Sequence, residues 1–374
     1  MRVLFTGGGT GGHFFPIIAV VRELRRIAEE ERILDLEFYY AGPDDFGEED
    51  LEKEDIFPIR IVSGKRRRYA SWQNFFDLFK IGIGILQAFW KLFVVLPDVI
   101  FSKGGYGSIP ILFVARIYQI PIIIHESDAV PGAVNAWAAK FAKRIAVSFA
   151  ASAKYFPDHK IALTGNPIRK KLIGGNRKDA KDNLGIVSDT LPVIFFIGGS
   201  LGAQKINEAV IEKLPEYIAR CEVLHQTGRN NFDDTTLQAH AILENIENKD
   251  RYYPIAFFDE RTLHDTYAAC DLVIARAGAG LIFEIASVGK PSILIPLKNS
   301  AQNHQRENAY AYAKNGAALV IEEDNLTPYL LFTEVTTLLQ NKKMLGEMAQ
   351  AAEKFSRLDA AEVIAREIIK LGLH

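Results

Sequence analysis

One local pattern, an apolar strand followed by a glycine-rich turn and an amphipathic helix, occurs twice in this chain. It begins at residues 3–5 with a turn at 7–12, and it recurs at 193–197 with a turn at 198–202, about 190 residues later. Glycine-rich turns that lead from a buried strand into a helix are typical of doubly wound parallel sheets. Because 374 residues exceed the size of one ordinary domain, the repeat predicts two Rossmann-like domains in tandem.

Further apolar runs alternate with helical patterns, which predicts a parallel sheet covered by helices on both faces in each domain. The expected strands are 36–40, 98–102, 121–125 and 144–147 in the first half and 222–225, 255–258, 272–275 and 292–296 in the second. Glycine and proline interrupt the pattern between 164 and 191, where we expect the domain boundary. Ligands of such folds lie beyond the carboxyl ends of the strands. We therefore expect the two domains to face each other across a cleft that holds the functional site.

Composition excludes several classes of function. Lys and Arg total 44 against 46 Asp and Glu, so the chain lacks the basic excess of a dedicated nucleic-acid-binding protein. Cys221 and Cys270 are too few for a disulfide framework or a cysteine-based zinc site. No secretory signal is apparent, and the most apolar window, 81–96, is shorter than the ~20 residues that span a bilayer. We expect a cytosolic protein that does not cross the membrane and that uses no metal or cofactor.

The first glycine turn formally satisfies the dinucleotide-binding pattern GxGxxG. The next strand, however, ends Tyr-Tyr-Ala-Gly at 39–42, without the acid that would hold a ribose, which weakens a dehydrogenase interpretation. So many glycines let backbone amides approach a ligand closely. His13 follows at the start of the helix; a lone histidine is usually structural, but this position favours a functional group.

The turns at 198–203 and 276–280 also place amides at the start of a helix, and three such turns indicate a ligand with a diphosphate. Glu284 lies one helical turn further on, where it could accept from ribose hydroxyls or could be an ordinary surface carboxylate. The polar loops at 125–128 and 304–305 suit the recognition of sugar hydroxyls, although each alone is only moderately suggestive.

A basic segment precedes a run of aromatic residues in the first half. Seven bases and one acid lie between Arg60 and Lys91, and aromatic and aliphatic residues recur at helical spacing from Trp72 to Trp90. Such a helix could be part of the core, but the adjoining basic run favours a helix that lies on an anionic membrane surface. Gly82 and Gly84 argue against a regular helix.

In their order along the chain, the motifs resemble those of the glycosyltransferases of family 28 that act in peptidoglycan synthesis. The matching segments are GGGTGGH at 7–13, GGYGSIP at 104–110, HESDAVPG at 125–132, GNPIR at 165–169, GGSLGA at 198–203, HQTGR at 225–229, RAGAGLIFE at 276–284 and the stretch at 303–305. Any one of these is weak evidence, whereas the ordered set over nearly the whole chain is specific.

The resemblance implies the glycosyltransferase-B fold and inverting chemistry that needs no metal. The implied reaction transfers N-acetylglucosamine from UDP-N-acetylglucosamine to the 4-hydroxyl of the muramyl sugar in undecaprenyl-pyrophosphoryl-MurNAc-pentapeptide, converting lipid I to lipid II. It also implies peripheral binding to the anionic cytoplasmic face of the bacterial cell membrane, with other cell-wall synthesis proteins as potential partners.

The resemblance also assigns roles to single residues. His13 matches the general base that takes the proton from the acceptor hydroxyl. The implied donor-binding residues are Thr10, Gly11, Gly12, Asp128, Arg169, Ser200, Phe258, Ala279, Gly280, Leu281, Glu284, His304 and Gln305. The implied acceptor or cleft residues are Tyr106, His125 and Glu126. The implied membrane residues are Arg66, Arg67, Arg68, Trp72, Phe75, Phe79 and Trp90.

Among the donor residues, the backbone of Phe258 matches the position that meets the uracil, and Glu284 matches the one that holds the ribose. The diphosphate would lie against Ser200, Arg169 and the turn that begins at Ala279. The sugar would be bound by Asp128, His304 and Gln305. Asp128 stands where the family usually has Asn. An amide that donates and accepts hydrogen bonds is thus replaced by a carboxylate that only accepts them.

The implied domains are 1–166 for the acceptor and the membrane and 167–357 for the UDP-sugar, with 358–374 as a last helix that packs back on the first domain. Two alternatives stay open. One is a lipid glycosyltransferase with a different sugar or acceptor, such as a diacylglycerol galactosyltransferase. The other is a membrane-associated nucleotide-sugar-binding protein, which would have no need of His13. A sugar-nucleotide epimerase fits less well because it has no use for the basic and aromatic segment.

Overall fold

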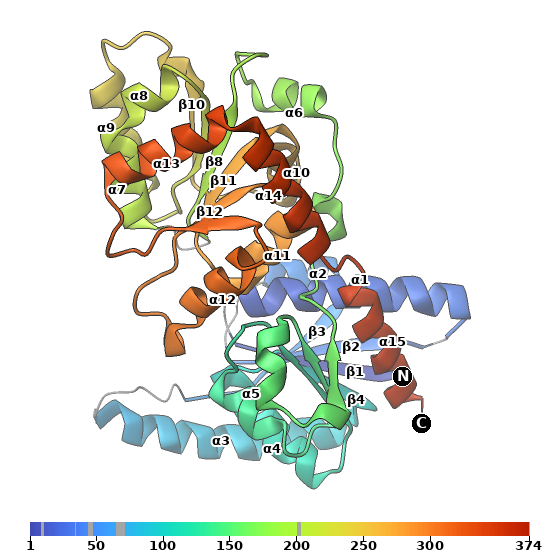
Figure 1. The fold of residues 1–374 in the computed structure, drawn as a ribbon. Helices are drawn as coiled ribbons and strands as arrows, with labels where there is room; N and C mark the ends of the chain where they lie inside the picture. The colour runs from blue at the N-terminus through green and yellow to red at the C-terminus, as the bar shows by residue number, and fades with distance from the viewer. Residues whose placement is uncertain (9–10, 34, 44–47, 65–71, 200–202, 374) are drawn as a thin grey trace. The chain divides into compact units, whose positions relative to one another are not determined.

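The computed structural model describes the chain apart from residues 9–10, 34, 44–47, 65–71, 200–202 and 374, and apart from the side chains of 11, 13 and 72–78. The described residues form two compact α/β units, each with its own sheet and core (Figure 1). The first unit comprises Met1–Ile168 and Arg357–His374, and the second comprises Arg169–Ser356. The chain thus leaves the first unit after Ile168 and returns to it at Arg357.

The first unit is built on a parallel sheet whose described strands follow the order β3-β2-β1-β4-β5-β6-β7. These strands are β1 (Arg2–Thr6), β2 (Glu37–Gly42), β3 (Ile56–Arg60), β4 (Val99–Ser102), β5 (Ile122–Glu126), β6 (Arg144–Val147) and β7 (Ile161–Leu163). The order reverses between β1 and β4. In doubly wound sheets this switch point is where ligands bind, beyond the carboxyl ends of the strands.

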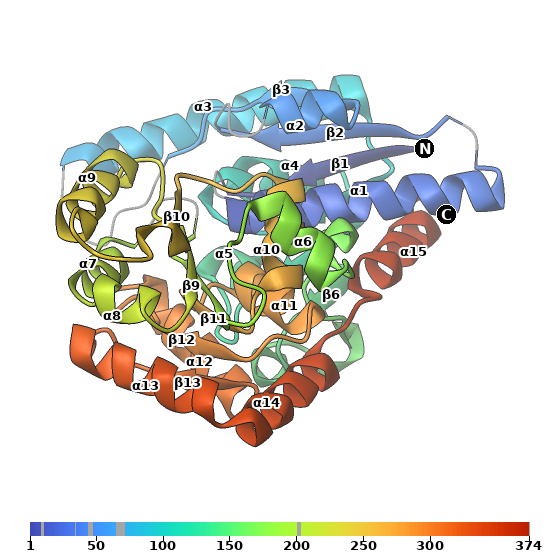
Figure 2. The ribbon, with the colours of Figure 1, turned by 90° about the horizontal axis from the view of Figure 1, so that it is seen from above.

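Helices cover both faces of this sheet. They are α1 (Gly11–Glu31), α2 (Glu48–Lys53), α3 (Trp72–Val95), α4 (Ile109–Ile117), α5 (Ala133–Ala138) and α15 (Ala360–Gly372). Val3 and Phe5 of β1 pack into the core under α1 and α15, whereas Leu4 packs into the core under α3 and α4. Because successive strand residues point to opposite faces, a sheet covered on both sides needs an unbroken apolar run. Figure 2 shows α15 lying beside α1, with which it packs.

The second unit has a parallel sheet with the order β10-β9-β8-β11-β12-β13 among its described strands. They are β8 (Val193–Ile197), β9 (Glu222–Gln226), β10 (Tyr252–Ile255), β11 (Leu272–Ala275), β12 (Ser292–Leu294) and β13 (Ala318–Val320). The helices are α6 (Arg177–Leu184), α7 (Gln204–Glu212), α8 (Leu214–Ile218), α9 (Phe232–Leu243), α10 (Glu260–Ala269), α11 (Ala279–Ser287), α12 (His304–Ala313), α13 (Pro328–Gln340) and α14 (Lys342–Phe355). The switch point lies between β8 and β11.

The strand expected at 255–258 is wrong. The observed strand β10 ends at Ile255, after pairing with β9 from Tyr252 opposite Val223 to Ile255 opposite Gln226. The chain then turns toward α10, whose first turn is capped by Asp259 Oδ1 at 2.7 Å from the Thr262 amide. The apolar run beyond Ile255 therefore belongs to a connection between strand and helix.

The two glycines of α3 do not interrupt it, contrary to expectation, because the helix is continuous from Trp72 to Val95. Gly84 instead permits close packing, since a Cβ at this position would lie 2.0 Å from the carbonyl oxygen of Val62. Gln87 Oε1 accepts a hydrogen bond from the amide of Val62 at 2.9 Å. The segment that follows β3 is thus bound directly to α3.

Candidate functional site

In the second unit, the last residue of β9 connects the glycine turn after β8 with the segment between β10 and α10. The side-chain amide of Gln226 donates to the carbonyl of Gly199 at 3.0 Å, and its Oε1 accepts from the amide of Phe258 at 3.4 Å. Gly199 has a positive φ of 86°, which glycine adopts without strain. Ser200, assigned to the diphosphate, lies outside the described residues. Sequence reasoning gave Gln226 no role, although its place at the carboxyl end of a central strand was a usable signal.

The turn after β11 leads into α11 without a side-chain cap. Gly278 is the N-cap and provides no side-chain cap. Among the described residues, a Cβ added at Gly278 or Gly280 would meet no neighbouring side chain or segment within 4 Å. The first amides of a helix point along its axis and carry partial positive charge. The turn of Ala279, Gly280 and Leu281 can therefore bind a phosphate group.

Arg169 and Glu284, which were assigned separate roles, form an ion pair in the second unit. The Arg169 guanidinium nitrogens NH2 and Nε lie 2.8 and 3.2 Å from Glu284 Oε1, and both side chains are largely buried. Burial alone lowers the pKa of Arg169, but the charge and hydrogen bonds of Glu284 outweigh it and raise the pKa. Both bonds end on Oε1. Glu284 Oε2 therefore faces no donor among the described residues and can accept from a ligand hydroxyl.

A second buried ion pair supports the turn after β11. Arg276 NH2 lies 2.6 Å from Glu323 Oε1, while Arg276 NH1 donates to the carbonyl of Ile295 at 3.2 Å. Glu323 Oε2 accepts from the amide of Lys298 at 3.3 Å. Burial raises the pKa of Glu323, but its bonds to Arg276 outweigh burial and leave the pKa lowered. Arg276 follows β11, Ile295 follows β12 and Glu323 follows β13. These contacts therefore hold the segments after the three strands together at the base of the turn.

The segment before α12 holds His304 and Gln305. Gln302 and Asn303 have φ of 55° and 56°, an uncommon left-handed conformation for residues other than glycine. The Oε1 of Gln305 accepts from the amide of Leu297 at 3.0 Å, so its amide nitrogen is turned away from this backbone contact. His304 Nδ1 is hydrogen-bonded to the carbonyl of Ala301. Strained backbone of this kind is concentrated at ligand sites.

In the first unit, α1 begins at Gly11, so Gly11, Gly12 and His13 form its first turn directly beyond β1. Thr10 and the side chain of His13 lie outside the described residues. Tyr106 is half-buried on a short 3-10 helix, and a Cβ on the neighbouring Gly107 would lie 2.9 Å from the Gly7 carbonyl oxygen. Tyr106 is therefore placed beside the first glycine turn.

His125 and Glu126 end β5 and are both buried. His125 Nε2 lies 3.0 Å from the carbonyl oxygen of Gly165. Glu126 accepts from the backbone amides of Asp128 and Gly132, each at 3.0 Å, and from Asn135 Nδ2 at 2.9 Å. Burial, followed by the charge of Asp128, raises the pKa of Glu126. Glu126 thus shapes the loop that carries Asp128.

The helix α3 has one buried face and one exposed face. Gly84, Ala88 and Leu92 are buried at four-residue intervals, whereas Phe79 and Trp90 have exposed fractions of 71% and 66%. The other exposed apolar residues of this surface are Ile83, Leu86, Phe93 and Val94 on α3, Leu96 just beyond it, and Phe113 and Ile117 on α4. We call this set the α3 face. Arg66, Arg67 and Arg68 and the side chains of Trp72 and Phe75 lie outside the described residues.

No cluster of three or more histidine, cysteine or acidic side chains among the described residues could hold a metal ion. None of the described helices combines the length and the apolar character that crossing a membrane requires.

Comparison with known proteins identifies the family. The model of the glycosyltransferase family 28 N-terminal domain matches residues 3–147, and that of the family 28 C-terminal domain matches residues 193–364. The chain belongs to glycosyltransferase family 28. A relative from Clostridium botulinum is 36% identical over 371 residues, covering 99% of this chain and 98% of the relative. It is named UDP-N-acetylglucosamine--N-acetylmuramyl-(pentapeptide) pyrophosphoryl-undecaprenol N-acetylglucosamine transferase. A Bacillus cereus relative carries the same name with the number 2 added. It is 36% identical over 368 residues, covering 98% of this chain and 99% of the relative.

Solved structures agree with the family 28 assignment. The crystal structure of Acinetobacter baumannii MurG has a TM-score of 0.74 and 26% identity, covering 99% of both chains. A UDP-GlcNAc 2-epimerase from Neisseria meningitidis has a TM-score of 0.69 at 15% identity, covering 99% of this chain and all of the epimerase, and this likeness shows the fold alone. The predicted fold class of two Rossmann-like doubly wound domains is confirmed.

Proposed function

We propose that this chain transfers N-acetylglucosamine from UDP-N-acetylglucosamine to the 4-hydroxyl of the muramyl sugar in undecaprenyl-pyrophosphoryl-MurNAc-pentapeptide, with inversion at the anomeric carbon. The relatives that are 36% identical over nearly the whole chain carry this activity in their names. The observation that supports it most directly is that α11 begins without a side-chain cap in the same unit as the Arg169–Glu284 pair. A diphosphate and a ribose are the ligand groups that such an arrangement suits.

The second unit binds the donor in this proposal. The diphosphate lies against the amides of Ala279, Gly280 and Leu281, and the ribose hydroxyls donate to Glu284. Arg169 orients the Glu284 carboxylate through two hydrogen bonds, and it adds positive charge where negative charge develops on the departing UDP. No metal is needed for that stabilisation, because helix amides and a guanidinium provide it. His304 and Gln305 bind the sugar, and the backbone of Phe258 meets the uracil. Asp128, which belongs to the first unit, is assigned to the sugar as well.

The first unit binds the acceptor and supplies the base. His13 removes the proton from the acceptor hydroxyl as its oxygen attacks the anomeric carbon, and the bond from that carbon to the UDP oxygen breaks on the opposite side. A positioned base contributes about 10²–10⁴ to such a step. Gly12 and Thr10 close over the sugar, and Tyr106 lies beside the same turn.

The acceptor is anchored in a membrane, so the enzyme must bind to that surface to reach it. The α3 face is the apolar surface that would enter the interface, and the basic run at 65–68 precedes the helix that carries it. An apolar helix face combined with basic residues is the usual composition of a peripheral membrane contact. We place the protein on the cytoplasmic side, where UDP-sugars are available.

One transfer assay tests the reaction. Purified protein is incubated with radiolabelled UDP-N-acetylglucosamine and the muramyl-pentapeptide lipid, with UDP-galactose and diacylglycerol as competing substrates. We expect labelled disaccharide lipid and no inhibition by diacylglycerol. Transfer of galactose to diacylglycerol, or donor binding without any turnover, would contradict the proposal.

A further inference from the structure

Lys103 is a buried lysine to which the proposed reaction gives no role. It directly follows β4, at the carboxyl edge of the first sheet, and only 3% of its surface is exposed. Lysine is almost never fully buried unless it is paired, because removing an ammonium group from water is costly. A buried lysine beside the switch point of the sheet therefore requires an explanation.

The Lys103 ammonium is surrounded by three acceptors from separate parts of the first unit. Its Nζ is hydrogen-bonded to His125 Nδ1 and to Ser127 Oγ, and it lies 3.3 Å from Asn166 Oδ1. An ammonium group has three protons, so this set satisfies it completely. The Nε2 of His125 lies 3.0 Å from the Gly165 carbonyl oxygen, which fits a ring that donates from Nε2 and accepts at Nδ1.

Two carboxylates also influence the pKa of Lys103 electrostatically. Burial lowers the pKa of Lys103, and the charges of Glu126 and Asp128 counteract that effect. Glu126 is itself buried and holds the amides of Asp128 and Gly132. The loop that begins at Ser127 is thus fixed between Lys103 on one side and Glu126 on the other.

We infer that Lys103 is a positioning residue for sugar recognition. It binds the loop after β5 to the sheet through Ser127 and offsets the negative charge of Glu126 and Asp128, so that the Asp128 carboxylate is held where it contacts the donor sugar. This role deepens the proposed function and rests on it, because it takes Asp128 as a sugar-binding residue.

The test is a double-mutant cycle on Lys103→Met and Asp128→Asn, with kcat and KM for UDP-N-acetylglucosamine measured for wild type and all three variants. Methionine has nearly the length of lysine but no charge. Lys103→Met should raise KM about tenfold or more, because hydrogen bonds to charged groups are the stronger ones. The change in kcat should be smaller. In the Asp128→Asn background the same substitution should raise KM much less, since one of the uncompensated carboxylates is gone.

If the double variant raises KM by the product of the two single effects, the substitutions act independently and this role is overturned. An unchanged KM in Lys103→Met would also overturn it. If a thermal melt shows that Lys103→Met is unfolded, Ser127→Ala replaces it, because it removes one acceptor of Lys103 and leaves the cation in place. Ser148→Ala is the matched control, since Ser148 contacts His125 at 3.3 Å and makes no bond to Lys103. We expect Ser127→Ala to raise KM and Ser148→Ala to keep it. Equal KM values in these two variants would also overturn the role.

The wild-type measurement separates this inference from the proposed function. If wild type transfers no N-acetylglucosamine to the lipid acceptor, the proposed function fails. If wild type transfers the sugar and the two substitutions act independently, only the role of Lys103 fails.

Discussion

At the scale of single residues, Glu284 carries the sharpest prediction for donor binding. Its Oε1 accepts two hydrogen bonds from Arg169, which leaves Oε2 for a ribose hydroxyl. Glu284→Ala should weaken UDP binding by about 1.5–3 kcal/mol, the usual contribution of a hydrogen bond to a charged acceptor. Isothermal titration calorimetry with UDP measures this, and Glu347→Ala, at an exposed position on α14, is the matched control.

A 2′-deoxy donor distinguishes a lost hydrogen bond to the ribose from a general distortion of the binding site. Removing the ribose hydroxyl should cost wild type more affinity than it costs Glu284→Ala, because the variant has no carboxylate to accept from it. Equal losses in both proteins would show that Glu284 acts only through Arg169.

His13 carries the prediction for the chemical step. His13→Ala should lower kcat by roughly 10²–10⁴ and leave the affinity for UDP nearly unchanged, because a general base acts on the acceptor proton. Single-turnover transfer together with UDP titration separates the two effects. Near-normal turnover in the variant would mean that another group takes the proton.

At this scale, sequence motifs identify the residues assigned to the ligand more readily than the residues that hold them in position. Glu284 and Arg169 stand out by motif, but their pairing joins positions 115 residues apart, which no local pattern reports. Lys103 and Gln226 were missed for the same reason. Their side chains act on other strands and loops of the sheet edge, and only the folded sheet brings those partners together.

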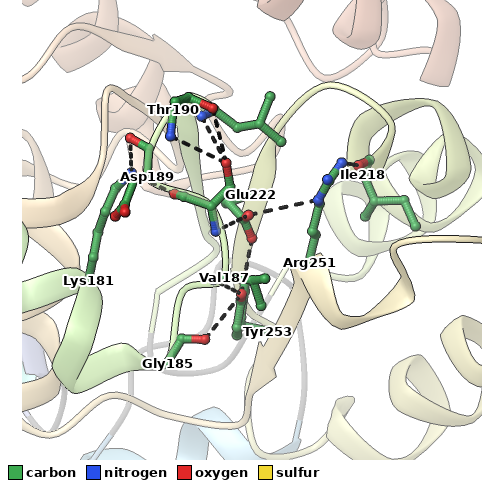
Figure 3. A network of polar contacts seen from close by, with 11 residues as sticks. Lys181, Gly185, Val187, Asp189, Thr190, Ile218, Glu222, Arg251 and Tyr253 are labelled. Carbon is green, nitrogen blue, oxygen red and sulfur yellow. Dashed lines mark hydrogen bonds and ion pairs between the residues drawn. The ribbon is translucent and has the colours of Figure 1, made fainter.

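At the scale of elements, a polar network holds the segment that links α6 and β8 against the amino end of β9 (Figure 3). Glu222 is fully buried. Its carboxylate accepts hydrogen bonds from the amide of Ser188 at 2.9 Å and from the hydroxyl of Tyr253 at 3.0 Å. The Nε of Arg251 lies 3.9 Å from the same carboxylate. Lys181 Nζ donates to the carbonyl of Ser188 at 2.9 Å. Burial raises the pKa of Tyr253 to about 12, so this hydroxyl remains a donor at neutral pH.

Glu222→Ala should destabilise the protein by about 1–3 kcal/mol, because it leaves the half-buried Ser188 amide without its acceptor and leaves the Tyr253 hydroxyl only its longer contact with the Gly185 carbonyl at 3.4 Å. It should leave KM for the donor unchanged, since donor groups lie at the opposite, carboxyl end of the strands. Thermal unfolding and steady-state kinetics measure the two effects, and the exposed Glu216→Ala is the control. A changed KM with an unchanged melting temperature would contradict this division of roles.

Long apolar elements were predicted well from the sequence, and short or edge elements were not. The central strands β1, β8 and β11 are unbroken apolar runs that are buried on both faces. The edge strands β3, β7 and β13 were missed: β3 contains Pro58 and has three exposed residues, and the other two have only three residues each. The exposed face of α3 was undecidable as well, because one helical period describes a core helix and a surface helix equally.

At the scale of the whole molecule, the fold class followed from the repeated strand, glycine turn and helix, because that unit is typical of a doubly wound sheet and opens each of the two sheets once. The contribution of α15 could not come from such local patterns. The chain leaves the first unit after Ile168 and re-enters it near Arg357, where α15 packs on α1. The pattern along the sequence alone would assign such a helix to the preceding domain, and the expectation that 358–374 packs back on the first domain came from the family resemblance.

The last prediction also concerns the whole molecule, because a water-soluble donor and a membrane-anchored acceptor must meet on one enzyme. Arg66, Arg67 and Arg68 should each contribute about 1 kcal/mol of attraction to anionic head groups, while Phe79 and Trp90 of the α3 face enter the interface. We therefore expect replacement of the three arginines by glutamate, or of Phe79 and Trp90 by serine, to abolish sedimentation with anionic vesicles. Thermal stability and transfer to a soluble short-chain acceptor should be unchanged. Leu237→Ser on α9, at a side chain that is also 71% exposed, is the matched control and should keep vesicle binding. Variants that still sediment with vesicles, or that unfold, would place the membrane contact on another surface and give the α3 face a structural role.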